Sequence, residues 1–173
     1  MKKCLILMFA MLFLTGCGTA ETAETVSDVY IQPVMGTMQQ AVVSLPVDAS
    51  VAVLESEDAG TIYLCDGYTV TLNSTPGGDL EKTLRRATGF GKEDLALMET
   101  EKDGIKRIHG VWTAAGETEQ QVGRLTILDD GSYHYVLTCM TDASKANQLQ
   151  PVWQDLFDSF RLVSPDYEIN TGS

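Results

Sequence analysis

Three apolar segments in the second half of the chain, separated by short turns, constrain the fold more than any other feature. Residues 104–113, 122–128 and 132–141 are rich in β-branched, aromatic and other apolar side chains, which favours strands. Asp130-Gly131, before the last segment, is a pair typical of hairpin turns. Because a parallel crossover needs a dozen or more connecting residues, the three predicted strands must be antiparallel neighbours.

The first half of the chain predicts shorter strands and one helix. Asp79 is a good N-cap residue for a helix over residues 80–87, and Thr88-Gly89 would end it. We expect a further short helical turn over residues 92–98. The segments that we expect to form strands are 41–45, 51–54, 61–65 and 68–72.

A longer helix is predicted near the C-terminus, over residues 145–160. Val152, Leu156 and Phe160 recur every four residues and form an apolar stripe along it. A short edge strand over residues 161–163 would follow, and then a polar tail over residues 165–173. We therefore expect a single α+β domain over residues 41–164, with an antiparallel β-sheet on which the long C-terminal helix and the shorter middle helix pack.

This order of elements resembles the PsbP-like superfamily. Chains of that superfamily tend to end in a helix that runs into a Ser-Phe pair and a short strand, as Asp158-Ser-Phe-Arg-Leu-Val163 does here. The resemblance covers residues 45–163. It implies the fold, and it implies a binding or accessory role, since its members include photosynthetic extrinsic subunits, a nuclear-transport factor and bacterial lipoproteins. None of its functional residues has a motif that can be placed on this chain.

The N-terminus has the order of an export signal. Lys2 and Lys3 precede an apolar run over residues 5–14, which is too short for a membrane span. The run ends in Leu14-Thr-Gly-Cys17, which resembles the lipobox of secreted bacterial lipoproteins. The resemblance implies that a signal peptide, residues 1–16, is removed and that the sulfur of Cys17 carries a diacylglyceryl group.

Location and partners follow from this anchor and from the charge. Lipidated Cys17 and a flexible tether would make up residues 17–40, although the stretch after residue 28 fits a short early strand equally well. Lipidation places the domain on the extracytoplasmic face of the cell membrane. With a net charge of -12, the chain would be repelled by nucleic acid and by anionic headgroups, so we expect no nucleic acid partner and membrane contact through the anchor alone. The expected partner is an envelope protein or a small ligand.

Two cysteines remain in the predicted domain, Cys65 and Cys139, both in strand-like segments. An even pair in an exported domain fits a disulfide. Two buried free thiols that act as small hydrophobic side chains fit the same pattern. The sequence leaves both alternatives open, because it does not show whether the two Cα atoms come within reach.

Two histidines, His109 and His134, are the residues on which a catalytic or metal site would depend. The strands that carry the two histidines are separated by one other predicted strand, so histidine side chains on the same face would be roughly 10 Å apart. The strand between them offers no metal ligand. We therefore expect no metal site. Motifs for a phosphate-binding loop or a serine nucleophile are absent from the sequence, and we expect no cofactor. A hydrolase that uses His109 or His134 with a carboxylate remains the alternative function.

Aromatic and basic residues of the three-strand segment form the candidate binding face. Tyr133 and Tyr135 alternate with His134 and would point to one side of their strand. If no helix covers that side, it is the best candidate surface, and its residues would be Tyr133, Tyr135, Arg107, His109 and Arg124. The sequence therefore favours a non-enzymatic, lipid-anchored envelope lipoprotein that binds a protein partner or a small ligand, as an accessory subunit for example.

Overall fold

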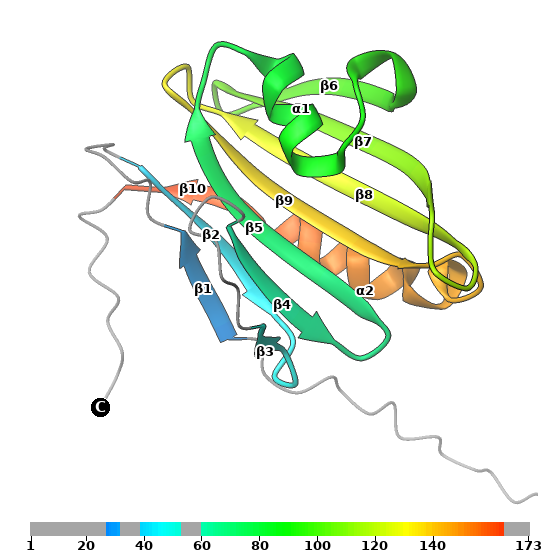
Figure 1. Ribbon diagram of the computed structural model, residues 1–173. Helices are drawn as coiled ribbons and strands as arrows, with labels where there is room; N and C mark the ends of the chain where they lie inside the picture. Colours follow the sequence, from blue (N-terminus) through cyan, green and yellow to red (C-terminus); the bar gives the residue numbers. More distant parts are fainter. Residues whose placement is uncertain (1–26, 32–38, 53–59, 165–173) are drawn as a thin grey trace, which may run out of the picture.

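The computed structural model describes residues 27–31, 39–52 and 60–164, so the predicted signal peptide, Cys17 and the C-terminal tail lie outside the described residues. The described chain has a mixed α+β fold in which a large antiparallel sheet dominates (Figure 1). This confirms the predicted fold class. The strand order of the large sheet is β3-β4-β5-β9-β8-β7-β6. Its strands are β3 (Ser50–Val51), β4 (Thr61–Cys65), β5 (Tyr68–Pro76), β6 (Ala96–Lys102), β7 (Ile105–Ala115), β8 (Gln120–Asp129) and β9 (Tyr133–Asp142).

A second, three-stranded sheet has the order β1-β2-β10. Its strands are β1 (Ser27–Ile31), β2 (Gln40–Leu45) and β10 (Arg161–Val163). The first of them lies inside the segment 17–40 that was expected to be a tether. Its residues form a strand because all five pair with β2, from Ser27 opposite Leu45 to Ile31 opposite Ala41.

The predicted run of three antiparallel strands is confirmed by the pairing of β7 with β8 and of β8 with β9. The turn between the last two uses the chemistry that the sequence indicated. Gly131 has a φ of 86°, a left-handed conformation that glycine adopts without steric cost. The Oδ1 atom of Asp130 accepts hydrogen bonds from the backbone N–H groups of Ser132 and Tyr133, at 2.8 Å and 2.7 Å.

Two predictions for the middle of the chain were wrong. Residues 96–98, expected to be helical, begin strand β6, and only Lys92–Asp94 forms a 3-10 turn, η2. The strand forms because Asp103 and Gly104, with φ angles of 56° and 75°, close a tight hairpin between β6 and β7. Strand β5 also continues to Pro76, four residues beyond the predicted end at 72, because its whole length pairs with β9.

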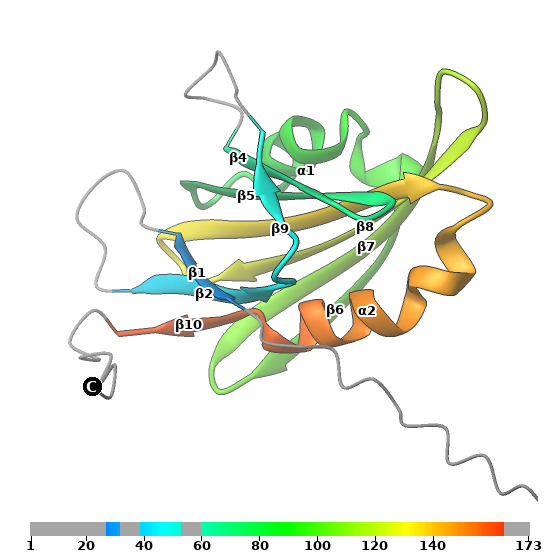
Figure 2. The same ribbon diagram turned by 90° about the horizontal axis from the view of Figure 1, so that it is seen from below.

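The large sheet separates two hydrophobic cores. Helix α2 (Ala146–Ser159) packs on one face together with β2, and helix α1 (Leu80–Thr88) packs on the other (Figure 2). Alternate residues of β9 point to opposite faces of the sheet: Tyr135 and Leu137 belong to the α2 core, and Val136 belongs to the α1 core. We call these two sides the α2 face and the α1 face.

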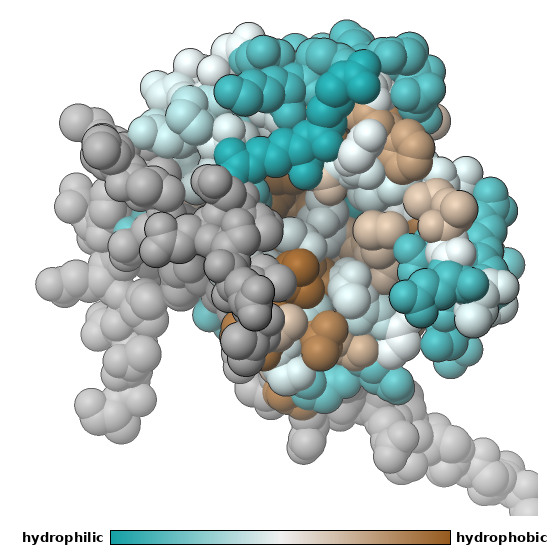
Figure 3. Space-filling view, in the orientation of Figure 1, coloured by the Kyte–Doolittle hydropathy of each residue, from teal (hydrophilic) through white to brown (hydrophobic). Residues whose placement is uncertain are grey.

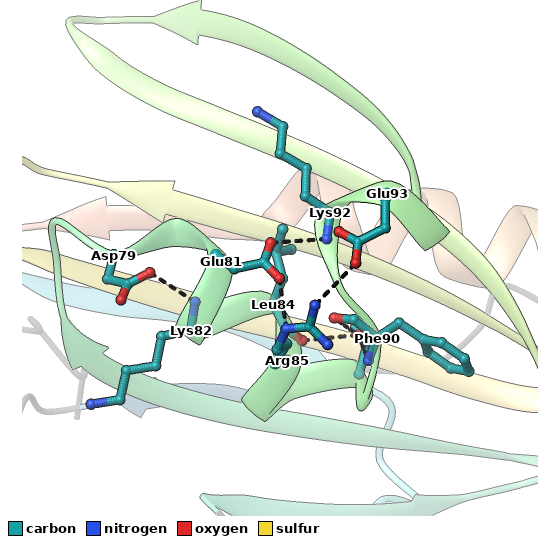
Figure 4. Close-up of polar contacts among 9 residues, drawn as sticks. Asp79, Glu81, Lys82, Leu84, Arg85, Phe90, Lys92 and Glu93 are labelled. Atoms are coloured by element: carbon teal, nitrogen blue, oxygen red, sulfur yellow. Dashed lines mark hydrogen bonds and ion pairs between the residues drawn. The ribbon is translucent and has the colours of Figure 1, made fainter.

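Helix α1 is fixed by its caps and by one inward side chain. The carboxylate of Asp79 accepts a hydrogen bond from the backbone N–H of Lys82 at 2.9 Å (Figure 4). At the other end, Gly89 ends the helix in the left-handed conformation with φ 81°. Fully buried Leu84 anchors the helix in the α1 core. The outward surface of α1 is hydrophilic (Figure 3).

Charged side chains join α1 to the 3-10 turn η2. Glu81 contacts Arg85 at 2.6 Å and accepts a hydrogen bond from the backbone N–H of Lys92 at 3.0 Å (Figure 4). The same arginine reaches Glu93 at 3.0 Å. Because these charged groups are half-exposed, the ion pairs contribute little to the free energy of unfolding. Their main effect is to hold η2 against α1.

Candidate functional site

The five residues of the predicted binding face all lie on the α2 face. Their strand register shows this: His109 is opposite Thr126 and Arg107 is opposite Leu128, which in turn is opposite Tyr135. Paired residues of antiparallel strands point to the same side. The structure therefore brings together the full set of Tyr133, Tyr135, Arg107, His109 and Arg124 on one side of β7, β8 and β9.

Much of this face is covered by α2 and by its C-terminal end. Tyr135 is fully buried and donates a hydrogen bond to the carbonyl oxygen of Gln39 at 3.1 Å. The guanidinium of Arg124 lies 4.6 Å from the ring centre of Phe157, and Arg107 donates to the carbonyl oxygen of Phe160 at 3.4 Å. The two arginines thus attach the helix to the sheet, through a cation–π contact and at the negative end of the helix dipole.

His109 lies half-buried beside the region that α2 covers. Its ring nitrogens are 3.0 Å from the hydroxyl of Thr126 and 3.2 Å from the hydroxyl of Thr100. Burial lowers the pKa of His109 below its ordinary value, and the positive charges of Arg124 and Arg107 lower it further. The ring is therefore neutral near pH 7, with hydroxyl neighbours and no carboxylate contact among the described residues.

His134 lies on the opposite side of the sheet, on the α1 face, and is 2 % exposed. Its Nδ1 atom is 2.7 Å from the hydroxyl of Thr83 in α1, and its Nε2 atom is 3.6 Å from a carboxylate oxygen of Asp129. The sheet therefore stands between the two histidines. Within the described chain, the histidine that has a carboxylate neighbour is enclosed, and the half-exposed one has none.

Metal ligands are not grouped in the described part of the chain: no three His, Cys, Asp or Glu side chains there are placed to hold one ion. Cys65 and Cys139 are both free thiols. They point to the same face but sit on β4 and β9 with β5 between them, a separation of about 10 Å that exceeds the reach of a disulfide. Burial raises the pKa of both thiols, so neither is activated as a nucleophile.

The structure contains a site that the sequence did not indicate, a hollow of about 490 Å³ beside α2. We call it the α2 hollow. It is formed by three separate parts of the chain: the end of β2 with the turn after it, the start of β5 with the turn before it, and one side of α2 over residues 148–156. Its lining residues are Ser44, Pro46, Val47, Asp48, Asp66, Tyr68, Gln148, Leu149, Val152, Asp155 and Leu156.

The walls of the α2 hollow are mainly apolar and its charges are all negative. Buried Leu156 and Tyr68 belong to the α2 core, whereas Val47 and Val152 are 60 % and 41 % exposed. The volume and the mixture of apolar walls with a few polar groups are typical of ligand sites. No signal in the sequence connects these segments, because residues about a hundred positions apart meet only when α2 packs beside β2.

Comparisons with known proteins support the fold. No protein-family model matches the chain, and no curated protein matches it significantly in sequence. Among solved structures, the cyanobacterial PsbP protein CyanoP from Synechocystis sp. PCC 6803 is similar with a TM-score of 0.57 and 10% identity, over 87% of this chain and 99% of that one. LpqN of Mycobacterium tuberculosis, a protein involved in cell envelope biogenesis, is similar with a TM-score of 0.51 and 12% identity, over 81% of this chain and 92% of that one.

These similarities show that the described chain has a PsbP-like fold. They also agree with the order of strands and helices from which the resemblance was inferred. A search for membrane spans covered the described residues and found no helix with the length and hydropathy to cross a bilayer.

Proposed function

We propose that the protein is a lipid-anchored binding or accessory protein of the cell envelope, attached to the membrane through Cys17. The observation that carries the binding role is the α2 hollow, which has apolar walls, an open side and exposed valines at its edge. Exposed apolar side chains around a concavity mark surfaces that are covered by another molecule. The fold is consistent with this role, since the similar LpqN takes part in envelope biogenesis.

The chemistry of the two histidines supports binding rather than hydrolysis. A general base must reach the substrate and must have a pKa near the working pH. His134 is enclosed by α1 and the sheet, and the pKa of His109 is lowered by burial and further by the charges of Arg124 and Arg107. No observation in the described structure favours the hydrolase alternative, so we propose the binding function alone.

The anchor is tested by replacing the predicted lipidated residue in the full chain. We expect Cys17→Ser to move the protein from the membrane fraction to the soluble fraction of the producing cells, and to abolish labelling by a clickable fatty-acid analogue. Cys139→Ser is the matched control, because it removes a buried thiol and leaves the lipobox intact. Equal membrane association of Cys17→Ser and wild type would contradict lipid anchoring.

The binding role is tested by site-specific crosslinking in intact cells. A photoreactive amino acid at Val47 or Val152 of the full chain should give a crosslinked adduct, whereas the same residue at Glu101, on the edge strand β6, should give none. A thermal-shift screen of the purified full chain with sugars, amines, peptides and lipid headgroups covers small ligands. Absence of adducts at both positions together with a flat screen would overturn the proposed function.

A further inference from the structure

The electrostatics of the α2 hollow narrow the class of its ligand. Three of its lining residues, Asp48, Asp66 and Asp155, are exposed carboxylates. Asp48 and Asp66 lie in turns, Asp155 lies in α2, and no basic residue among the described ones lines the hollow with them. None of the three forms an ion pair with a described residue, and nearby Lys145 is paired with Asp142. These carboxylates would repel an anionic ligand and attract a cationic group.

The apolar walls require that the cation be attached to an apolar body. Leu149, Leu156 and the ring of Tyr68 line the interior, below the carboxylates of the edge. A small hydrated cation would leave the apolar walls exposed to water. A purely apolar ligand would remove water from the carboxylates and would offer them no group to bind in its place. Both parts are satisfied by a lysine or arginine side chain flanked by apolar residues, since its alkyl stem packs on apolar surface while its charged end stays at the edge.

The apolar surface continues outside the hollow, which favours a peptide segment over a free small amine. Val47 and Val152 are more than one-third exposed at the edge, on two different elements. A small amine inside the hollow would leave both valines in water. A chain segment that crosses the hollow would cover both and insert one basic side chain between the carboxylates.

From these observations we propose that the α2 hollow binds a short segment of an envelope protein partner, in which lysine or arginine is flanked by apolar residues. This inference rests on the proposed binding function and specifies its partner. It predicts that affinity falls with salt, because exposed charges at the edge are screened.

The test is selection of peptides from a random phage-displayed library on the purified full-length chain. We expect the enriched peptides to share a basic residue between apolar ones. Their affinity should fall about tenfold or more in the triple variant Asp48→Asn, Asp66→Asn, Asp155→Asn, since the basic side chain then loses the attraction of all three carboxylates around it. The double variant Val47→Gln, Val152→Gln should also weaken binding while it leaves the carboxylates in place.

A second triple variant controls for net charge. This variant removes an equal number of negative charges from exposed positions that do not line the hollow, through Asp94→Asn, Glu101→Gln and Glu117→Gln. It should leave peptide affinity within twofold of wild type. Circular dichroism and thermal melting verify that all variants fold.

Each other outcome overturns the inference. Acidic or uncharged enriched peptides, an equal loss of affinity in both triple variants, or no enrichment at all would show that the hollow does not bind such a segment. Crosslinking at Val47 or Val152 would still support the binding function in those cases, so the two failures are distinguishable. Crosslinks between two copies of this chain would identify a self-association surface and would likewise overturn the proposed occupant.

Discussion

Gly123 on β8 lies directly opposite Trp112 on β7, and the indole ring covers the glycine on the α1 face. A methyl group at Gly123 would overlap that ring, because the Cβ position is occupied by the indole carbons. The glycine is thus required for close packing, while its backbone is extended like that of its neighbours. Trp112 is 3 % exposed and belongs to the α1 core.

We expect Gly123→Ala to destabilise the protein by about 1–3 kcal/mol, which is the usual cost of adding volume to a packed core. Urea unfolding measures the change. The double variant Gly123→Ala, Trp112→Leu should show coupling, with a smaller loss than the sum of the two single changes. Additive effects in this cycle would contradict the proposed overlap.

His109 gives the protein a pH dependence whose sign follows from its neighbours. Its folded-state pKa is lowered from the ordinary 6.5, so the unfolded chain takes up the proton first as the pH falls. The stability that this group contributes is present above about pH 6.5 and is lost as the pH falls toward the folded-state value. We expect the urea midpoint of wild type to decrease from pH 7 to pH 5.

The variant His109→Gln should lose part of this decrease, since glutamine keeps a polar contact to the threonine hydroxyls and does not titrate. The comparison of urea midpoints at pH 7 and pH 5 isolates the histidine, because most carboxylates titrate at lower pH. An unchanged decrease in the variant would show that other groups cause it.

At the scale of elements, α1 depends on its ends because its length is only nine residues. A helix this short is marginal in isolation and is maintained by capping and by burial of one face. Asp79 supplies the N-terminal cap, and its side chain is otherwise directed to solvent. The cap therefore contributes to stability without contributing to the core.

We expect Asp79→Ala to cost about 1 kcal/mol, the typical loss for an N-cap, and Asp79→Asn to cost much less because the amide oxygen still accepts the hydrogen bond. Thermal or urea unfolding of both variants measures this. Equal destabilisation by alanine and asparagine would indicate that the charge, and not the hydrogen bond, matters.

Elements with strong local signals could be predicted from the sequence, and those defined by long-range pairing could not. The strands β7, β8 and β9 carry alternating apolar residues and short turns, so their order and direction were predictable. Strand β6 was missed because its sequence, Ala-Leu-Met-Glu-Thr-Glu-Lys, is polar toward its end and its pairing with β7 supplies the stability. The local signal for this strand is the pair Asp103-Gly104, which closes the hairpin to β7.

The candidate site was predictable only in part, for a similar reason. Strand alternation places Tyr133 and Tyr135 on one side of their strand, and Arg107 and His109 on one side of theirs. Whether these two sides coincide depends on the register between the strands, which the structure supplies. The coverage of that face by α2 and the assembly of the α2 hollow depend on where the C-terminal helix packs. Position along the chain does not specify this, because Asp48 and Asp155 meet through tertiary packing alone.

At the scale of the whole molecule, β9 is a central strand that contributes to both cores, as its neighbour β8 also does. It lies between β5 and β8, and residues 134–139 are buried on both faces. Opening of its hydrogen bonds requires that both cores be disrupted together. An edge strand such as β6 can separate with the loss of fewer contacts.

We therefore expect the slowest amide hydrogen exchange in β9, with protection close to the global free energy of unfolding, and faster exchange in β6. Exchange followed by mass spectrometry or NMR under native conditions measures both strands in the same sample. Protection of β6 equal to that of β9 would show that the sheet opens only as a single unit.

The separation of the two cores by one sheet also bears on how such a sequence can change over evolutionary time. Substitutions on the α1 face and on the α2 face meet different neighbours, so each half can drift under its own packing constraints, and compensation is needed only within a half. Such a fold has two sets of acceptable sequences, which are linked at the strands that contribute to both cores, β8 and β9. Proteins of this architecture can therefore have a similar fold at low sequence identity, and this chain and CyanoP are similar with a TM-score of 0.57 at 10% identity.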